Sequence, residues 1–162
     1  MTAQTGRTTF KNVRFLLEDS GGVLRHIPIN SLTAVGVTYD EVDVTAFQDA
    51  VRGMLPAMPD APIEIGGPFD TTAAAVSPAL SGSHTVLATL NGLMSPLTLD
   101  IQIGMRQTWE AGEPQFGITA SATSGYIVTN YIVNPQEGTY TARLVLFPGS
   151  SLPAWGTAAE TV

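Results

Sequence analysis

Apolar and polar residues alternate along much of this chain. The alternation is clearest in three segments, at residues 97–104, 116–123 and 139–147. A period of two predicts β-strands that bury one face and expose the other. The same pattern in shorter form adds strands at residues 12–17, 23–29 and 62–65. The turn residues 19–22 predict that the first two of these form a β-hairpin.

The segment at 126–133 differs because both of its faces are apolar. One face carries Ile127, Tyr131 and Val133, and the other carries Tyr126, Val128 and Ile132. Such a strand is either central and covered on both sides or prone to aggregation. The second cover is expected from a helix of the same chain or from a neighbouring subunit. Tyr126, Val128 and Ile132 are therefore candidates for a subunit interface.

One helix is well marked, and a second, shorter one is predicted before it. Val86, Leu87, Leu90 and Leu93 share a helical face, Ser83 can cap its start, and Asn91-Gly92 can end it. The second helix would begin at Thr45, where residues 45–48 match a capping box, and Gly53 and Pro56 would keep it short. The preceding residues 37–44 predict a strand or an extended loop.

Length and composition exclude several classes of protein. The 162 residues suffice for one domain with one hydrophobic core. Because there is no cysteine, a disulfide scaffold, thiolate catalysis and a sulfur-ligated zinc site are excluded. No apolar run is long enough to span a bilayer, and residues 1–10 lack the apolar core of a secretory signal. We therefore expect no membrane partner.

The chain is acidic and carries few charges. Asp and Glu total 14 against 7 Lys and Arg, which gives a formal net charge of −7. Because such a surface repels phosphate backbones, stable nucleic-acid binding is disfavoured. Charged residues make up 13% of the chain, about half the usual share. Extensive self-association is one explanation, because surface covered by other subunits does not need charged residues.

Both ends of the chain are small, polar and poorly patterned. Residues 1–8 and 148–162 predict either disordered termini or arms that become ordered on a neighbouring subunit. Trp155 is a lone aromatic residue in the second of these, and aromatic residues of this kind are enriched at interfaces. Trp155 is therefore a further candidate for a subunit interface.

A catalytic site is hard to assemble from these residues. A Ser-His-Asp set could use Ser81 or Ser83, His84 and Asp70. However, no G-x-S-x-G motif is present, and neighbours on a helix do not face each other. We therefore expect no catalysis and no cofactor.

A metal site is also poorly supported. The densest acidic cluster comprises Asp40, Glu41, Asp43 and Asp49, but it lacks the glycine and glutamate spacing of an EF-hand loop. The alternatives are a loose Ca²⁺ site and an acidic strand that faces solvent or a lumen. We therefore expect no metal. A β protein with few charges and no catalytic or metal site is typical of a structural subunit.

Four segments carry a family resemblance through their order and spacing. They are VTYDEVDVTAFQD at 37–49, PIEIGGPFD at 62–70, SGSHTVLATLNG at 81–92 and the strands of 97–147. Together they resemble the major tail tube proteins of long-tailed, siphovirus-like bacteriophages and their prophage relatives. The resemblance covers roughly residues 10–148, and no single segment is specific for the family.

The resemblance implies a mainly β tail-tube fold. Two packed antiparallel β-sheets, sandwich- or barrel-like, would be flanked by one α-helix in a single domain over residues 1–162. Six subunits would form a ring whose inner strands join into a barrel, and rings would stack into a helical tube. The arms at 1–8 and 148–162 and a long loop at 36–61 would bridge neighbours.

The implied function is structural. The chain would be part of the phage tail of a virion, assembled in the bacterial host cytoplasm from copies of itself and other tail proteins. DNA would pass through the tube without binding, because acidic side chains facing the channel repel phosphates. Asp40, Glu41, Asp43 and Glu64 are the candidates for the channel wall. The alternative is another virion β protein, such as a capsid decoration, tail terminator or head–tail joining protein.

Overall fold

The fold is described from a computed structural model, which describes residue 6 and residues 12–104 and 111–158. The elements are β1 (Asn12–Glu18), β2 (Leu24–Ile27), β3 (Ser31–Leu32), β4 (Thr38–Asp43), β5 (Met54–Asp60), β6 (Ile63–Pro68), α1 (Ser83–Leu90), β7 (Leu99–Gly104), β8 (Pro114–Ile118), β9 (Tyr126–Asn134), β10 (Thr139–Leu146) and β11 (Ala154–Thr157). The predicted strands and the central helix are thus present within these described ranges.

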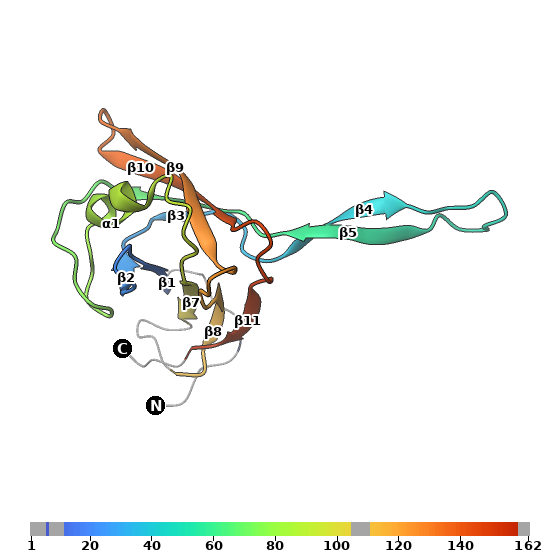
Figure 1. Ribbon diagram of the computed structural model, residues 1–162, viewed down its shortest axis with the longest axis horizontal. Coiled ribbons are helices and arrows are strands. Elements are labelled where there is room, and N and C mark those ends of the chain that lie inside the picture. The colour runs from blue at the N-terminus through green and yellow to red at the C-terminus, as the bar shows by residue number, and fades with distance from the viewer. Residues whose placement is uncertain (1–5, 7–11, 105–110, 159–162) are drawn as a thin grey trace.

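The strands form three antiparallel sheets. The first has the order β11-β8-β7-β1-β2, the second has the order β3-β6-β10-β9, and β4 and β5 form a two-stranded sheet. The first two sheets lie together in a body, and the β4–β5 hairpin projects away from it (Figure 1). The expected mainly β fold, with two packed sheets and one flanking helix, is confirmed.

The two larger sheets share one hydrophobic core. Phe15 lies opposite Ile101 in the first sheet, and Ile65 lies opposite Ala142 in the second. These side chains are buried and belong to a single cluster. Because burying a Leu, Ile or Phe side chain stabilises a fold by about 1.5–3 kcal/mol, the alternating apolar positions hold the sheets together.

Helix α1 covers one side of this core. Its buried face consists of Val86, Leu87 and Leu90, and it contacts β9 and β2. Leu93 lies beyond the end of the helix and is partly exposed. The helix ends at Asn91, as expected, and Gly92 follows with the positive φ that suits a glycine.

Ser83 does not cap the helix, because it is already the first helical residue and its hydroxyl has other partners. Its Oγ donates to the carbonyl of Pro68 at 2.9 Å and accepts the N–H of Asp70 at 3.2 Å. The side chain therefore ties the start of α1 to the end of β6.

A β-bulge explains why the segment 126–133 has two apolar faces in sequence. The register between β9 and β10 shifts between Arg143 and Leu144. Tyr126 and Val128 before the shift, and Tyr131 and Val133 after it, consequently all pack on the core side. The expected placement of Tyr131 and Val133 on the face opposite Tyr126 and Val128 is therefore wrong, while Ile127 on that opposite face is also buried.

Two further expectations are wrong. Residues 45–51 form the turn that joins β4 to β5 and not a short helix, because hydrogen bonds across the hairpin bring Val44 and Gly53 together. The strand predicted over 116–123 ends at Ile118, and the N–H of Ser121 instead donates to the carbonyl of Ser124 at 2.9 Å in a turn. The small side chains at 120–123 offer little apolar surface to hold a strand.

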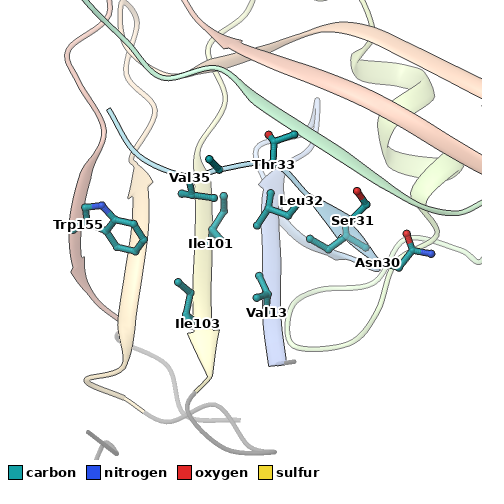
Figure 2. A pocket seen from close by; sticks show the side chains of 11 residues that line it. Val13, Asn30, Ser31, Leu32, Thr33, Val35, Ile101, Ile103 and Trp155 are labelled. Carbon is teal, nitrogen blue, oxygen red and sulfur yellow. The ribbon is translucent and has the colours of Figure 1, made fainter. Parts of the chain in front are cut away.

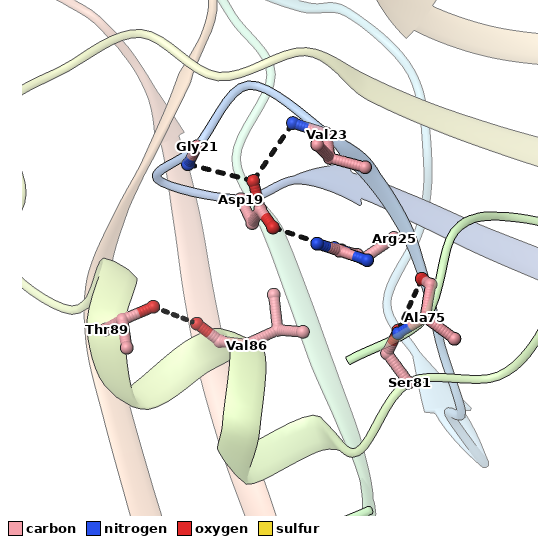
Figure 3. Close-up of polar contacts among 8 residues, drawn as sticks. All are labelled: Asp19, Gly21, Val23, Arg25, Ala75, Ser81, Val86 and Thr89. Carbon is pink, nitrogen blue, oxygen red and sulfur yellow. Dashed lines mark hydrogen bonds and ion pairs between the residues drawn. The ribbon is translucent and has the colours of Figure 1, made fainter. Parts of the chain in front are cut away.

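The turn between β1 and β2 is organised by Asp19 (Figure 3). Its Oδ1 accepts the N–H groups of Gly21 and Val23, each at 2.9 Å, and its Oδ2 accepts Arg25 Nε at 2.7 Å. Burial by itself would raise the pKa of Asp19, but these hydrogen bonds outweigh it and lower the pKa. The predicted hairpin is confirmed, and hydrogen bonds to the Asp19 carboxylate stabilise its turn.

The segment predicted as a C-terminal arm contains a strand of the same sheet. β11 pairs with β8, with Trp155 opposite Phe116 and their ring centroids 5.2 Å apart. The arm expected at residues 1–8 lies outside the described residues, apart from Gly6. The predicted long loop at 36–61 is the β4–β5 hairpin.

Two glycines on neighbouring strands provide a test of the packing around β8. A Cβ on Gly117 would clash with the carbonyl oxygen of Leu99 and lie 2.5 Å from Asp100 Oδ1, whereas a Cβ on Gly156 would meet nothing within 4 Å. Gly117→Ala should lower the free energy of unfolding by about 1–3 kcal/mol, and Gly156→Ala by less than about 0.5 kcal/mol. Urea denaturation measures both, and equal losses would contradict the described β7–β8 approach.

Candidate assembly surfaces

The β4–β5 hairpin exposes large apolar side chains along its whole length. In Figure 1 it extends away from the body, and β4 and β5 pair with each other. The exposed side chains are Tyr39, Val42, Val44, Phe47, Val51, Met54, Leu55 and Met58. A two-stranded hairpin without a packed face is at best marginally stable in water. This apolar surface therefore has no cover within the described part of its own chain.

The two faces of the hairpin differ in chemistry. Val42 lies opposite Leu55, and Val44 follows two residues later on the same face. Glu41 and Asp43 occupy the alternate positions of β4 and point to the other face. The face of Val42 and Leu55 is thus mainly apolar, whereas the other face carries Glu41 and Asp43 opposite Pro56 and Met54.

Asp43 and Thr45 organise the tip of the hairpin. The N–H of Thr45 donates to Asp43 Oδ1 at 2.9 Å, and the N–H of Gly53 donates to Thr45 Oγ1 at 2.8 Å. Arg52 Nε forms an ion pair with Asp43 Oδ2 at 3.1 Å. Hydrogen bonds from Thr45, followed by the bond from Arg52, lower the pKa of Asp43 from its ordinary value.

A second pair of bonds shapes the turn itself. The N–H of Ala46 donates to Asp49 Oδ2 at 2.8 Å, and the N–H of Asp49 donates to the carbonyl of Ala46 at 3.0 Å. Phe47 lies inside this turn and is fully exposed, and Val51 is exposed next to it. The tip is therefore an ordered turn that holds an aromatic side chain in solvent.

An apolar groove opens at the edge of the core (Figure 2). It has a volume of about 520 Å³ and is lined by β1, β7 and β11 on one side and by residues 29–35 on the other. Val13, Ile101 and Ile103 contribute the core face of the first sheet, and the Trp155 ring points toward β7. The core face of this sheet thus continues into an open groove.

The four predicted channel acids do not form one surface. Glu41 and Asp43 share one face of the hairpin, whereas Asp40 alternates with them along β4. Glu64 lies on β6, where its Oε1 forms an ion pair with Arg143 Nη1 at 3.0 Å. Their position in a channel wall stays a prediction.

The predicted interface residues divide into two groups. Tyr126 and Val128 are buried in the core of their own chain, and the Tyr126 hydroxyl donates to the carbonyl of Ala61 at 2.8 Å. They have no surface to offer a partner, because this end of β9 packs on the core. Ile132 is 58% exposed and Trp155 is 52% exposed, so these two remain accessible.

The side chains considered for catalysis do not form a triad. Asp70 meets Ser83 and His84 only through its backbone, whose N–H donates to Ser83 Oγ and whose carbonyl accepts the N–H of His84. The Asp70 carboxylate instead accepts the Thr72 hydroxyl, the His84 ring lies 3.0 Å from the Tyr131 hydroxyl, and Ser81 Oγ donates to the carbonyl of Ala75. In the part of the chain that the structure describes, no group of three or more His, Asp or Glu side chains is arranged to hold a metal ion. The described helix is too short to cross a membrane.

Comparisons with known proteins identify the fold. No protein-family profile matches the chain, and no curated protein matches its sequence. The tube-terminating cap of the anti-feeding prophage aligns with 98% of this chain and 95% of its own, with a TM-score of 0.59 and 10% identity. This chain therefore shares the fold of that cap protein.

A second solved structure agrees with the first. The sheath/tube terminator of an extracellular contractile injection system, PVC, in its extended state, aligns with 96% of this chain and 99% of its own, with a TM-score of 0.56 and 10% identity. The expected relation to phage tails is thus supported at the level of the fold. Both solved structures are described as tube terminators.

Sequence reasoning missed the groove and the turn at the tip. The groove joins residues 29–35 to β1, β7 and β11, and nothing in the local pattern indicates that these segments meet. The tip did leave a signal, because Asp43, Asp49 and Gly53 are typical turn residues. The match of Thr45 to a capping box obscured it.

The titration of Asp43 provides a test of the tip. Because its pKa lies below the ordinary value of 3.8, the stabilisation by the ionised carboxylate is complete above pH 3.8 and is lost as the pH falls through the folded-state pKa. We expect the amide NMR signals of Thr45 and Gly53 to shift in that acidic window while the body stays folded. Asp43→Asn should abolish the pH-dependent shift. Signals that stay fixed until global unfolding would contradict the described tip.

Proposed function

We propose that this chain is a structural subunit that terminates the tube of a phage tail or a tail-like injection particle. The observation that carries the proposal is the agreement in fold, over nearly the whole chain, with two tube terminators. A main-tube subunit, the first expectation from the sequence, is less well supported.

The surfaces of the molecule support a role inside an assembly. The hairpin carries apolar side chains, among them Val42, Leu55 and Phe47, that its own chain leaves exposed. In this proposal other copies of the chain cover them in a closed ring, and the ring sits on the end of a tube built by other tail proteins. The proposed location is therefore the tail of a virion or a tail-like particle, and the role requires no catalysis.

The acidic face of the hairpin suits the rim of a channel. Glu41 and Asp43 point away from the apolar strip formed by Val42, Val44 and Leu55. If that strip lies on a neighbouring subunit, the carboxylates remain in solvent. Negative charge there repels a passing phosphate backbone over roughly a Debye length of 8 Å, so DNA would pass without binding.

Electron microscopy of the purified protein tests the proposal. A terminator should form closed rings at high concentration that do not grow into long tubes, because its outer face must end the assembly. Long open tubes would overturn the terminator assignment in favour of a main-tube subunit. Single chains at every concentration, with no ring, would contradict both and favour a protein that binds a preformed particle.

A further inference from the structure

The tip of the hairpin is built to present one aromatic side chain. Phe47 is fully exposed although the turn around it is fixed by Asp49 and by the contacts of Thr45. A fixed loop loses little conformational freedom on binding, so preorganisation of this kind favours docking. An aromatic residue presented by an ordered turn is a typical anchor of a protein interface.

The groove has the complementary chemistry. Its lining contains no charged side chain and includes Leu32, Val35, Ile103 and Trp155. In Figure 2 these side chains surround the groove from both sides. Aromatic pairs with offset or tilted rings add attraction beyond apolar burial. The groove therefore suits an uncharged aromatic side chain.

A hairpin tip cannot reach the groove of its own chain. The groove segment ends at Val35, and β4 begins at Thr38 and runs away from the body (Figure 1). An extended strand from Thr38 to Phe47 covers about 30 Å. The tip therefore lies far from the groove of its own chain. A hairpin tip that enters this groove must belong to another molecule.

We infer that Phe47 of one copy docks in the groove between residues 29–35 and Trp155 of the next copy. The contact joins two different surfaces of the same chain, so it repeats from subunit to subunit and gives a ring when the rotation closes. The inference rests on the proposed function, because it takes the neighbouring ring subunit as the partner. The apolar strip of Val42, Val44 and Leu55 would lie along that same neighbour.

Cysteine cross-linking tests the contact directly, because the chain contains no cysteine of its own. Phe47→Cys and Ala34→Cys place single thiols on the tip and on the exposed rim of the groove. The two variants, carrying different affinity tags, are mixed at high concentration and mildly oxidised. The matched control mixes Phe47→Cys with Ala73→Cys, an exposed alanine outside the groove.

The inference predicts at least about tenfold more mixed disulfide in the first mixture than in the control. Equal amounts in the two mixtures would overturn it. Before mixing, the Ala34→Cys thiol should react rapidly with an alkylating reagent in dilute solution. Slow reaction would mean that the groove is already filled within one molecule, which would also overturn the inference.

Association measurements separate this contact from general stickiness. Phe47→Ser should raise the dissociation constant for self-association at least about tenfold, as expected for an aromatic anchor. Met94→Ser removes another exposed large apolar side chain, which lies outside the hairpin and the groove, and should leave the constant unchanged. Sedimentation velocity measures both. Rings that still form with Phe47→Ser would overturn the inference while leaving the proposed function intact.

Discussion

The β4–β5 hairpin cannot bury its apolar side chains within its own chain. This constraint underlies the proposal that the protein needs a partner molecule. A two-stranded sheet has no interior, so Val42 and Leu55 lie opposite each other in solvent. The hydrophobic effect favours covering such surface at about 25 cal/mol per Å². Hydrogen bonds at the tip hold the hairpin in shape until a partner supplies the cover.

The body, by contrast, completes much of its own structure. The first sheet ends at β2, where a bridge between His26 and Leu80 covers the edge. Bridges from Asn91 and Leu97 cover the first part of β9. The need for partners is therefore concentrated on the hairpin, the apolar groove and the exposed second half of β9 around Ile132. A closed body with an incomplete projection is the expected design of an assembly subunit.

Sequence periodicity predicted the strands of the body because each places an apolar face, with residues such as Phe15, Ile101 and Leu144, on a single core. The opposite face was expected to be exposed, but β1 and β7 also bury residues there, among them Arg14 and Gln102. Periodicity failed at β9, where a bulge changes the face without any change in composition. It also failed at Thr45, because Asp and Thr side chains satisfy backbone groups in a hairpin turn as well as at a helix start.

The candidate site was harder to predict than the fold. The acids of β4 and the aromatic Trp155 were identified from their types, but their faces and neighbours depend on the pairing of distant strands. The groove depends on residues 29–35 meeting β7 and β11, and one sequence cannot show such a meeting. Local patterns therefore predicted elements and chemistry, while the surfaces for assembly emerged only in three dimensions.

The central claim is that the hairpin acquires its missing cover from another molecule. Hydrogen exchange of the backbone amides at low and high protein concentration tests it most directly. The account predicts rapid exchange in β4 and β5 for the dilute protein, and protection of these strands and of residues 29–35 on association. Association without added protection of the hairpin would contradict it, as would a hairpin already as protected as the core in dilute solution.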